Sequence, residues 1–218
     1  MWLNRLEYKF GRYRIRNLSR YLVIGQVILF LVYTALPRFF YLNMYFPLVR
    51  SDLARGKIWE LVTVLFTPAT YSPINFLLSA YFLYFIGQAL EQVWGDFRFN
   101  VFILLSWLAA VISCLITGVG TMGYLPVVLF IAFALYYPDQ RLLLFFVIPI
   151  PARYLGLGAG LMLVYYLLRD PFYGKINLLL ACAVLFVFFG KGLVQHIRDE
   201  INNYKRRQAW KNANNRWR

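Results

Sequence analysis

Charged side chains are scarce in this sequence. Only 15% of the 218 residues are charged, whereas a soluble globular domain has about 25%. Hydrophobic residues make up 61%, and a chain of this length has no core large enough to bury them all. The scarcity of charge therefore excludes an ordinary soluble domain and predicts that the apolar residues are dissolved in lipid.

The sequence is equally poor in the side chains that most enzymes use. It has one histidine, His196, and two cysteines, Cys114 and Cys182, which lie within apolar runs without a CxxC spacing. No serine follows Ser113, and there is no glycine-rich phosphate loop or HExxH motif. These gaps argue against a disulfide framework, a metal site and a bound cofactor, and we expect none of the three.

The excess of basic residues, a net charge of +14, collects at the two ends of the chain. Residues 1–20 and 191–218 hold most of the 23 Lys and Arg residues. Basic segments that flank apolar spans face the cytoplasm and also attract anionic lipid headgroups. We therefore expect anionic lipids, and no nucleic acid, as partners of the two ends.

Each basic end allows two interpretations. Residues 1–20 form either a short amphipathic helix on the membrane surface or a disordered tail. The run Lys205-Arg206-Arg207 either recruits a soluble cytoplasmic partner or serves only to set the topology.

Six apolar runs divide the rest of the chain. They cover about residues 21–36, 74–88, 99–116, 123–137, 154–168 and 176–189. Runs of this length cross a bilayer when aromatic residues extend their ends. An even number of spans places both basic ends on the cytoplasmic side, as the positive-inside rule requires. The predicted fold is an all-α polytopic membrane domain, residues 21–190, between a basic segment and a basic tail.

Two other stretches are expected to be ordered without crossing the bilayer. Residues 38–73 mix aromatic and charged residues with prolines, which predicts a structured first outer loop that dips partly into the membrane. Residues 142–150 are apolar but short, and we place them at the interface. Gly156, Gly158 and Gly160 are expected to let helices approach closely.

Motifs between residues 56 and 153 carry a resemblance to a known family. Trp59 precedes a short apolar run, and a later span ends in Gly-x-Ala-hydrophobic-Glu-x-x-x-Gly. The residues of that second motif are Gly87, Ala89, Leu90, Glu91 and Gly95, and Tyr137-Pro138-Asp139-x-Arg141 follows later. This order resembles the rhomboid superfamily, which includes intramembrane serine proteases and the inactive derlins. The resemblance implies a rhomboid-like six-helix bundle, although Glu60 stands where the family has an arginine.

The same resemblance implies where a protease would keep its catalytic groups. The family's serine lies in Gly-x-Ser-Gly, and here the segment is Gly120-Thr121-Met122-Gly123, with methionine at the nucleophile position. The family's histidine lies in the sixth span, where residues 176–189 contain none. Its oxyanion donors correspond to Asn75 and Ser79. Because a nucleophile needs a base within about 3 Å, we predict no catalytic residue in this chain.

We therefore predict a non-catalytic pseudoprotease, similar to the derlins, that binds membrane-protein clients within the bilayer. Two alternatives stay open: a divergent active intramembrane protease, and a lipid- or small-molecule-binding or transport protein on the same fold. The expected location is a bacterial plasma membrane, with the ER membrane as the second choice.

Overall fold

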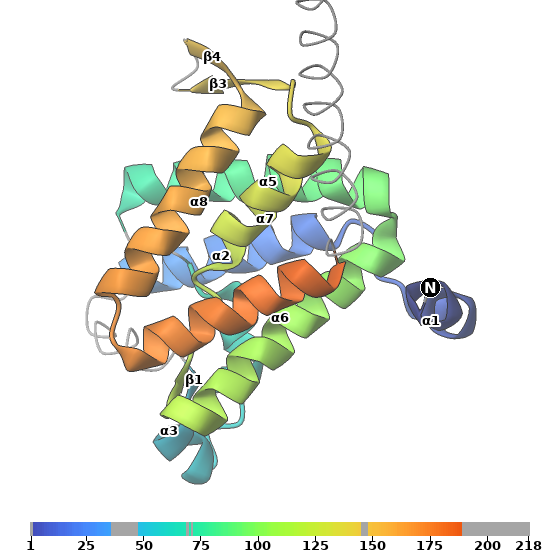
Figure 1. The fold of residues 1–218 in the computed structure, drawn as a ribbon. Helices are drawn as coiled ribbons and strands as arrows, with labels where there is room; N and C mark the ends of the chain where they lie inside the picture. Colours follow the sequence, from blue (N-terminus) through green and yellow to red (C-terminus); the bar gives the residue numbers. More distant parts are fainter. Residues whose placement is uncertain (1, 36–47, 69, 71, 145–147, 189–218) are drawn as a thin grey trace, which may run out of the picture. The chain divides into compact units, whose positions relative to one another are not determined.

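The computed structural model describes residues 2–35, 48–68, 70, 72–144 and 148–188, and within them the chain is mostly helical (Figure 1). It divides into two compact units, Met1–Val184 and Leu185–Arg218. The elements around the candidate site all belong to the first unit. His196 and the predicted basic tail, residues 191–218, lie outside the described residues.

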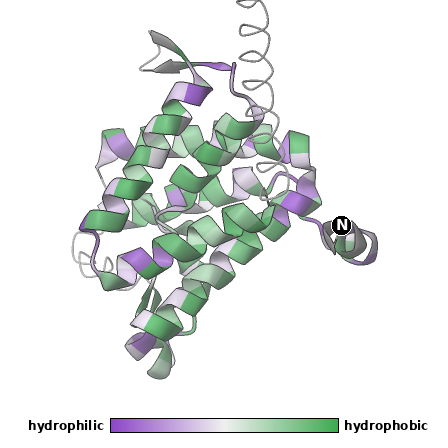
Figure 2. Cartoon of the chain, viewed as in Figure 1, coloured by the Kyte–Doolittle hydropathy of each residue, from purple (hydrophilic) through white to green (hydrophobic). Residues whose placement is uncertain are grey.

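Helices occupy the positions of the six predicted spans. They are α2 (Leu18–Ala35), α5 (Pro73–Trp94), α6 (Asp96–Thr117), α7 (Leu125–Tyr136), α8 (Ala152–Arg169) and a last helix, Phe172–Phe188. By length and composition α2, α5 and α6 are able to cross a membrane. Figure 2 shows that hydrophobic residues cover most of these helices. The structure thus supports a helical membrane protein, and the number of six spans stays a prediction.

The sequence explains where α5 begins and how it turns into α6. Ser72 is extended and Pro73 opens α5, where the missing proline N–H costs no hydrogen bond. Gly95 ends the helix with φ at +82°, a backbone conformation that side-chain-bearing residues avoid. Asp96 then begins α6, and its charge is favourable near the helix N-terminus.

The segments before α2 and after it are ordered where they are described. Residues at the start form α1 (Trp2–Phe10) and η1 (Gly11–Tyr13), so the helix rather than a disordered tail is observed. The described part of the predicted outer loop contains several short elements. These are β1 (Leu48–Val49), α3 (Arg50–Ala54), α4 (Glu60–Thr63) and η3 (Val64–Phe66).

Two short antiparallel ladders add to the helical fold. In the first, β1 pairs with β2 (Val119–Gly120), with Leu48 opposite Gly120. In the second, β3 (Arg141–Leu144) pairs with β4 (Ile148–Pro151). Within the apolar stretch 142–150, residues 142–144 and 148–150 thus pair as strands, and residues 145–147 lie outside the described residues.

The core is centred on α5, α6 and α7. Phe99, Phe102, Phe133, Leu90 and Leu129 are all less than 2% exposed. In contrast, α8 exposes large apolar side chains, with Leu157, Leu161 and Leu168 at 68%, 72% and 74%. A helix that is apolar on its exposed face fits a lipid environment rather than water.

Candidate functional site

The Gly-x-Ala-x-Glu motif of α5 holds the start of α2. The amide of Leu18 donates to Glu91 Oε1 at 2.7 Å, and the Ser19 hydroxyl donates to Glu91 Oε2 at 2.7 Å. One turn earlier, a Cβ on Gly87 would lie 2.7 Å from the Ser19 Cβ. Gly87 therefore allows the close approach that lets Glu91 cap α2, and a carboxylate is favoured at a helix N-terminus.

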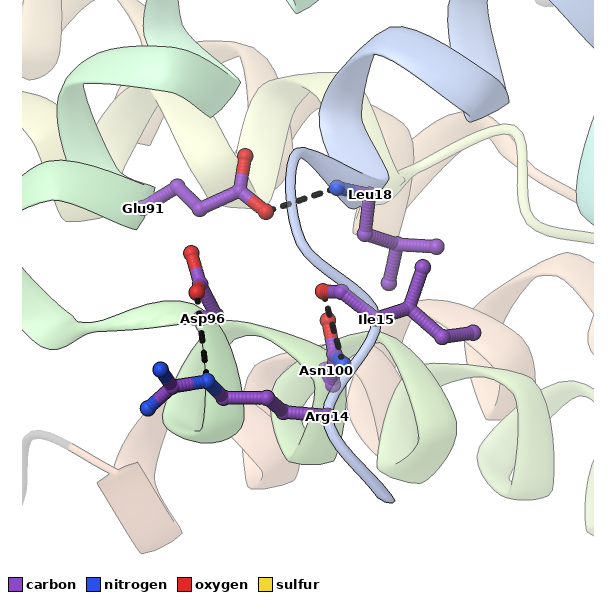
Figure 3. A network of polar contacts seen from close by, with 6 residues as sticks. All are labelled: Arg14, Ile15, Leu18, Glu91, Asp96 and Asn100. Atoms are coloured by element: carbon purple, nitrogen blue, oxygen red, sulfur yellow. Dashed lines mark hydrogen bonds and ion pairs between the residues drawn. The ribbon is translucent and has the colours of Figure 1, made fainter. Parts of the chain in front are cut away.

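The chain leading into α2 is fastened to the start of α6 by further polar contacts (Figure 3). Arg14 Nε lies 3.5 Å from Asp96 Oδ2, and Asn100 Nδ2 donates to the Ile15 carbonyl at 3.1 Å. Between these two residues of α6, Arg98 Nε lies 3.3 Å from Glu7 Oε2. Residues 87–100 thus bind the N-terminal segment through hydrogen bonds and ion pairs.

Glu60 ties the loop helix α4 to β1. Its side chain is fully buried, and its Oε2 accepts a hydrogen bond from the Val49 amide at 3.1 Å, while its Oε1 has no hydrogen-bond partner among the described residues. Burial raises the pKa of the Glu60 carboxyl, and the nearby charge of Asp52 raises it further. The neighbouring Trp59 is 55% exposed. The two residues at the predicted Trp-Arg position therefore differ. Glu60 is buried and joins α4 to β1, whereas Trp59 is a surface side chain.

A small cavity lies beside the predicted protease segment. Its volume is about 10 Å³, room for about one water molecule. Thr121 and Met122 line it together with Ser106 of α6 and Asn177 of the last helix. Asn177 is 3% exposed, and its Nδ2 has no hydrogen-bond partner in the part of the chain that the structure describes. The structure thus brings Thr121 and Met122 of the predicted protease segment into one cavity with Asn177.

The hydroxyl of Thr121 is bonded within its own turn. It accepts a hydrogen bond from the Gly123 amide at 3.0 Å, and no described residue of the cavity is a histidine, aspartate, glutamate or lysine. Tyr124, which also lines the cavity, donates its hydroxyl hydrogen to Asp170. In the described part of the chain, no three His, Cys, Asp or Glu side chains gather to hold a metal ion. Among the described residues that line the cavity, no side chain of the kinds that usually act as a general base lies beside the Thr121 hydroxyl group.

A larger, apolar groove lies on the other side of α7. Its volume is about 340 Å³, within the range of ligand pockets. Side chains of α5, α7, α8 and β3 line it: Ser79, Phe82, Leu83, Ile86, Pro126, Val127, Leu129, Phe130, Leu142, Leu155, Ala159 and Met162. Because α7 packs against both α5 and α8, which scarcely touch each other, the groove opens between those two helices.

The helical period of α7 separates the cavity from the groove. Leu125 and Val128, three positions apart, line the cavity, whereas Pro126 and Phe130, four apart, line the groove. Of the two predicted oxyanion positions, Ser79 lies in the groove and Asn75 is exposed near the start of α5. Neither joins Thr121 and Met122, so the structure does not assemble the predicted protease positions into one pocket.

Asn75 and Ser79 form a polar stripe on α5. They are four residues apart and therefore on one helix face, and neither makes a hydrogen bond to any described residue. Ser79 is the single hydroxyl in an otherwise apolar groove. A polar side chain without a hydrogen-bond partner is unfavourable in an apolar environment.

Sequence reasoning missed Asn177 and only partly anticipated the glycine contacts. Asn177 interrupts the apolar run Ile176–Ala181, and a polar residue in such a run is the signal that would have marked it. Among the α8 glycines, a Cβ on Gly156 would lie 2.5 Å from the Ala134 Cβ, whereas Gly158 and Gly160 have nothing within 4 Å. Only Gly156 therefore serves the predicted close approach, to α7.

Compared with models of known protein families and with curated protein sequences, the chain gives no match.

Proposed function

We propose that this chain is a non-catalytic, rhomboid-like membrane protein that binds a transmembrane helix of another membrane protein in the groove between α5 and α8. The observation that carries the proposal is the polar stripe of Asn75 and Ser79 beside an apolar groove of about 340 Å³. The groove offers space for apolar side chains, and the stripe offers hydrogen bonds to a helix backbone or to a polar side chain.

The stripe favours a protein helix over a lipid acyl chain. An acyl chain fills apolar space but has no group that pairs with a hydroxyl or an amide along its length. A transmembrane helix supplies both apolar knobs and polar groups, and small residues such as Ala159 permit its close approach. The proposal of six spans, with both ends on the cytoplasmic side, places this opening toward the surrounding lipid.

We expect no proteolysis because the sequence lacks the catalytic groups that the reaction needs. Met122 has no hydroxyl group, and the segment 48–188 contains no histidine. The proposed protein therefore holds its client without cutting it, and we expect no labelling by a fluorophosphonate probe. Labelling that disappears with Thr121→Ala would favour the divergent protease instead.

Site-specific photo-crosslinking tests the proposed groove. A photoreactive residue at Met162, which lines the groove, is compared with one at Leu161, which is 72% exposed and outside it. The full chain is expressed in its membrane, and the crosslinked segment is identified by mass spectrometry. We expect position 162 to capture an apolar spanning segment of another protein, and Ala159→Phe, which fills the groove, to abolish this product.

Three outcomes would contradict the proposal. Equal capture at positions 161 and 162 would show a non-specific contact. Capture of lipid alone at position 162 would favour lipid binding, the alternative function on this fold. Capture that survives Ala159→Phe, in a protein whose helicity is unchanged, would place the client outside the groove.

A further inference from the structure

The segment from Glu7 to Arg20 is strongly basic and largely exposed. It holds five basic residues and one acidic residue. Four of the basic residues have no carboxylate partner among the described residues: Lys9, Arg12, Arg16 and Arg20. The charges of these four side chains are therefore available to an anionic ligand.

Apolar and aromatic side chains are interleaved with these charges. Tyr8 and Tyr13 are 97% and 80% exposed, and Phe10 and Ile15 are 44% and 51% exposed. In water such exposure is unfavourable, whereas at a membrane interface tyrosine places its ring among the headgroups with its hydroxyl group in water. The segment therefore presents both the charges and the amphipathic rings that a lipid surface binds.

The segment is fixed in position rather than being a loose tail. The ion pairs Glu7–Arg98 and Arg14–Asp96 fasten it at two points, and Asn100 binds the carbonyl of Ile15. Directly after it, at Leu18, the apolar helix α2 begins. The four available charges are thus held beside the end of a helix that is able to cross a membrane.

We propose that residues 7–20 form a docking surface for the anionic headgroups of the surrounding bilayer, here called the N-terminal basic surface. Arg and Lys side chains bind the phosphate groups, and the exposed rings lie among the neighbouring headgroups. The position of the surface beside α2 selects the bilayer over a nucleic acid, since α2 holds it at the membrane plane. This proposal does not rest on the groove, and a negative crosslinking result there leaves it unaffected.

Native mass spectrometry of the full chain in detergent tests the surface. The protein is titrated with phosphatidylglycerol or with phosphatidylcholine of the same acyl chains. The wild type is expected to bind phosphatidylglycerol more tightly. Each substitution in the series Lys9→Gln, Arg12→Gln and Arg16→Gln is expected to reduce this preference about fivefold, because one basic residue near a membrane surface contributes about a factor of five.

Two controls separate local binding from net charge and from misfolding. The charge-keeping triple Lys9→Arg, Arg12→Lys, Arg16→Lys should retain the preference. A charge-matched triple elsewhere, Arg55→Gln, Arg169→Gln, Lys175→Gln, should retain it as well. An equal loss in this second triple would show a net-charge effect and overturn the proposal. So would equal binding of the two lipids by the wild type, or tight binding of an RNA or DNA oligonucleotide in place of lipid.

Discussion

Replacing Glu91 with alanine should detach the start of α2 from α5. The substitution removes both 2.7 Å hydrogen bonds and leaves the Leu18 amide and the Ser19 hydroxyl without their acceptor. Hydrogen bonds to a charged group contribute about 1.5–3 kcal/mol each, so the expected loss in the free energy of unfolding for the two bonds is about 3–6 kcal/mol. Glu91→Gln keeps the shape but not the charge, and should cost about 1 kcal/mol.

The assay is thermal unfolding of the full chain in detergent, followed by circular dichroism. For a chain of this size, 1 kcal/mol corresponds to about 2–4 °C, so Glu91→Ala should lower Tm by about 6–24 °C. Gly87→Ala should lower it too, because a Cβ 2.7 Å from that of Ser19 forces α2 and α5 apart.

A double-mutant cycle isolates the Glu91–Ser19 contact. Ser19→Ala should be destabilising in the wild type and nearly neutral once Glu91 has been removed, since the hydroxyl then has no carboxylate to bind. Additive effects within about 0.5 kcal/mol, or a Glu91→Ala loss below about 1 kcal/mol, would refute the assignment of Glu91 as the cap of α2.

Three further predictions use the same unfolding assay. Gly156→Ala should destabilise the folded protein by about 1–3 kcal/mol, because the added Cβ clashes with Ala134. Gly158→Ala has nothing within 4 Å of the added Cβ, so it should stabilise the folded protein by up to about 1 kcal/mol through helix propensity. Equal effects of the two substitutions would contradict the contact between Gly156 and Ala134. Because burial raises the pKa of Glu60, the folded state binds the extra proton, so Tm should rise as the pH falls from neutral toward the ordinary value of 4.5. Glu60→Gln should remove this rise, and a variant that keeps it would assign the dependence to another group. Asn177→Leu should raise Tm by about 2–4 °C, because it removes a buried amide nitrogen, Nδ2, that no described residue pairs. A clear fall in Tm would show that the amide binds a water molecule or a ligand.

The positions of the helices were accessible from the sequence, because apolar runs and their breakers are local features. The turn at Gly95, for example, is predicted by the polar residues that link two apolar runs. The strand pair of β3 and β4 was not predicted, since a short, wholly apolar run does not distinguish a strand from other structure.

The candidate site was less accessible, because it depends on how distant segments pack. Nothing local places Asn177 beside Thr121, or opens a groove between α5 and α8. Helix phase explains part of the glycine result: Gly158 is two residues from Gly156 and so lies on nearly the opposite face of α8. The resemblance to rhomboid proteins identified Glu91 as a motif residue, but only the structure gives its partners.

The distance in sequence between α2 and its capping carboxylate has a consequence for biosynthesis. Leu18 and Glu91 are 73 residues apart. At about 5–20 residues per second, the ribosome needs about 4–15 s to make the residues between them. During that interval the newly made helix has no carboxylate at its beginning, and its first amides are left to water or headgroups. The start of α2 therefore gains its carboxylate only after most of α5 has been translated.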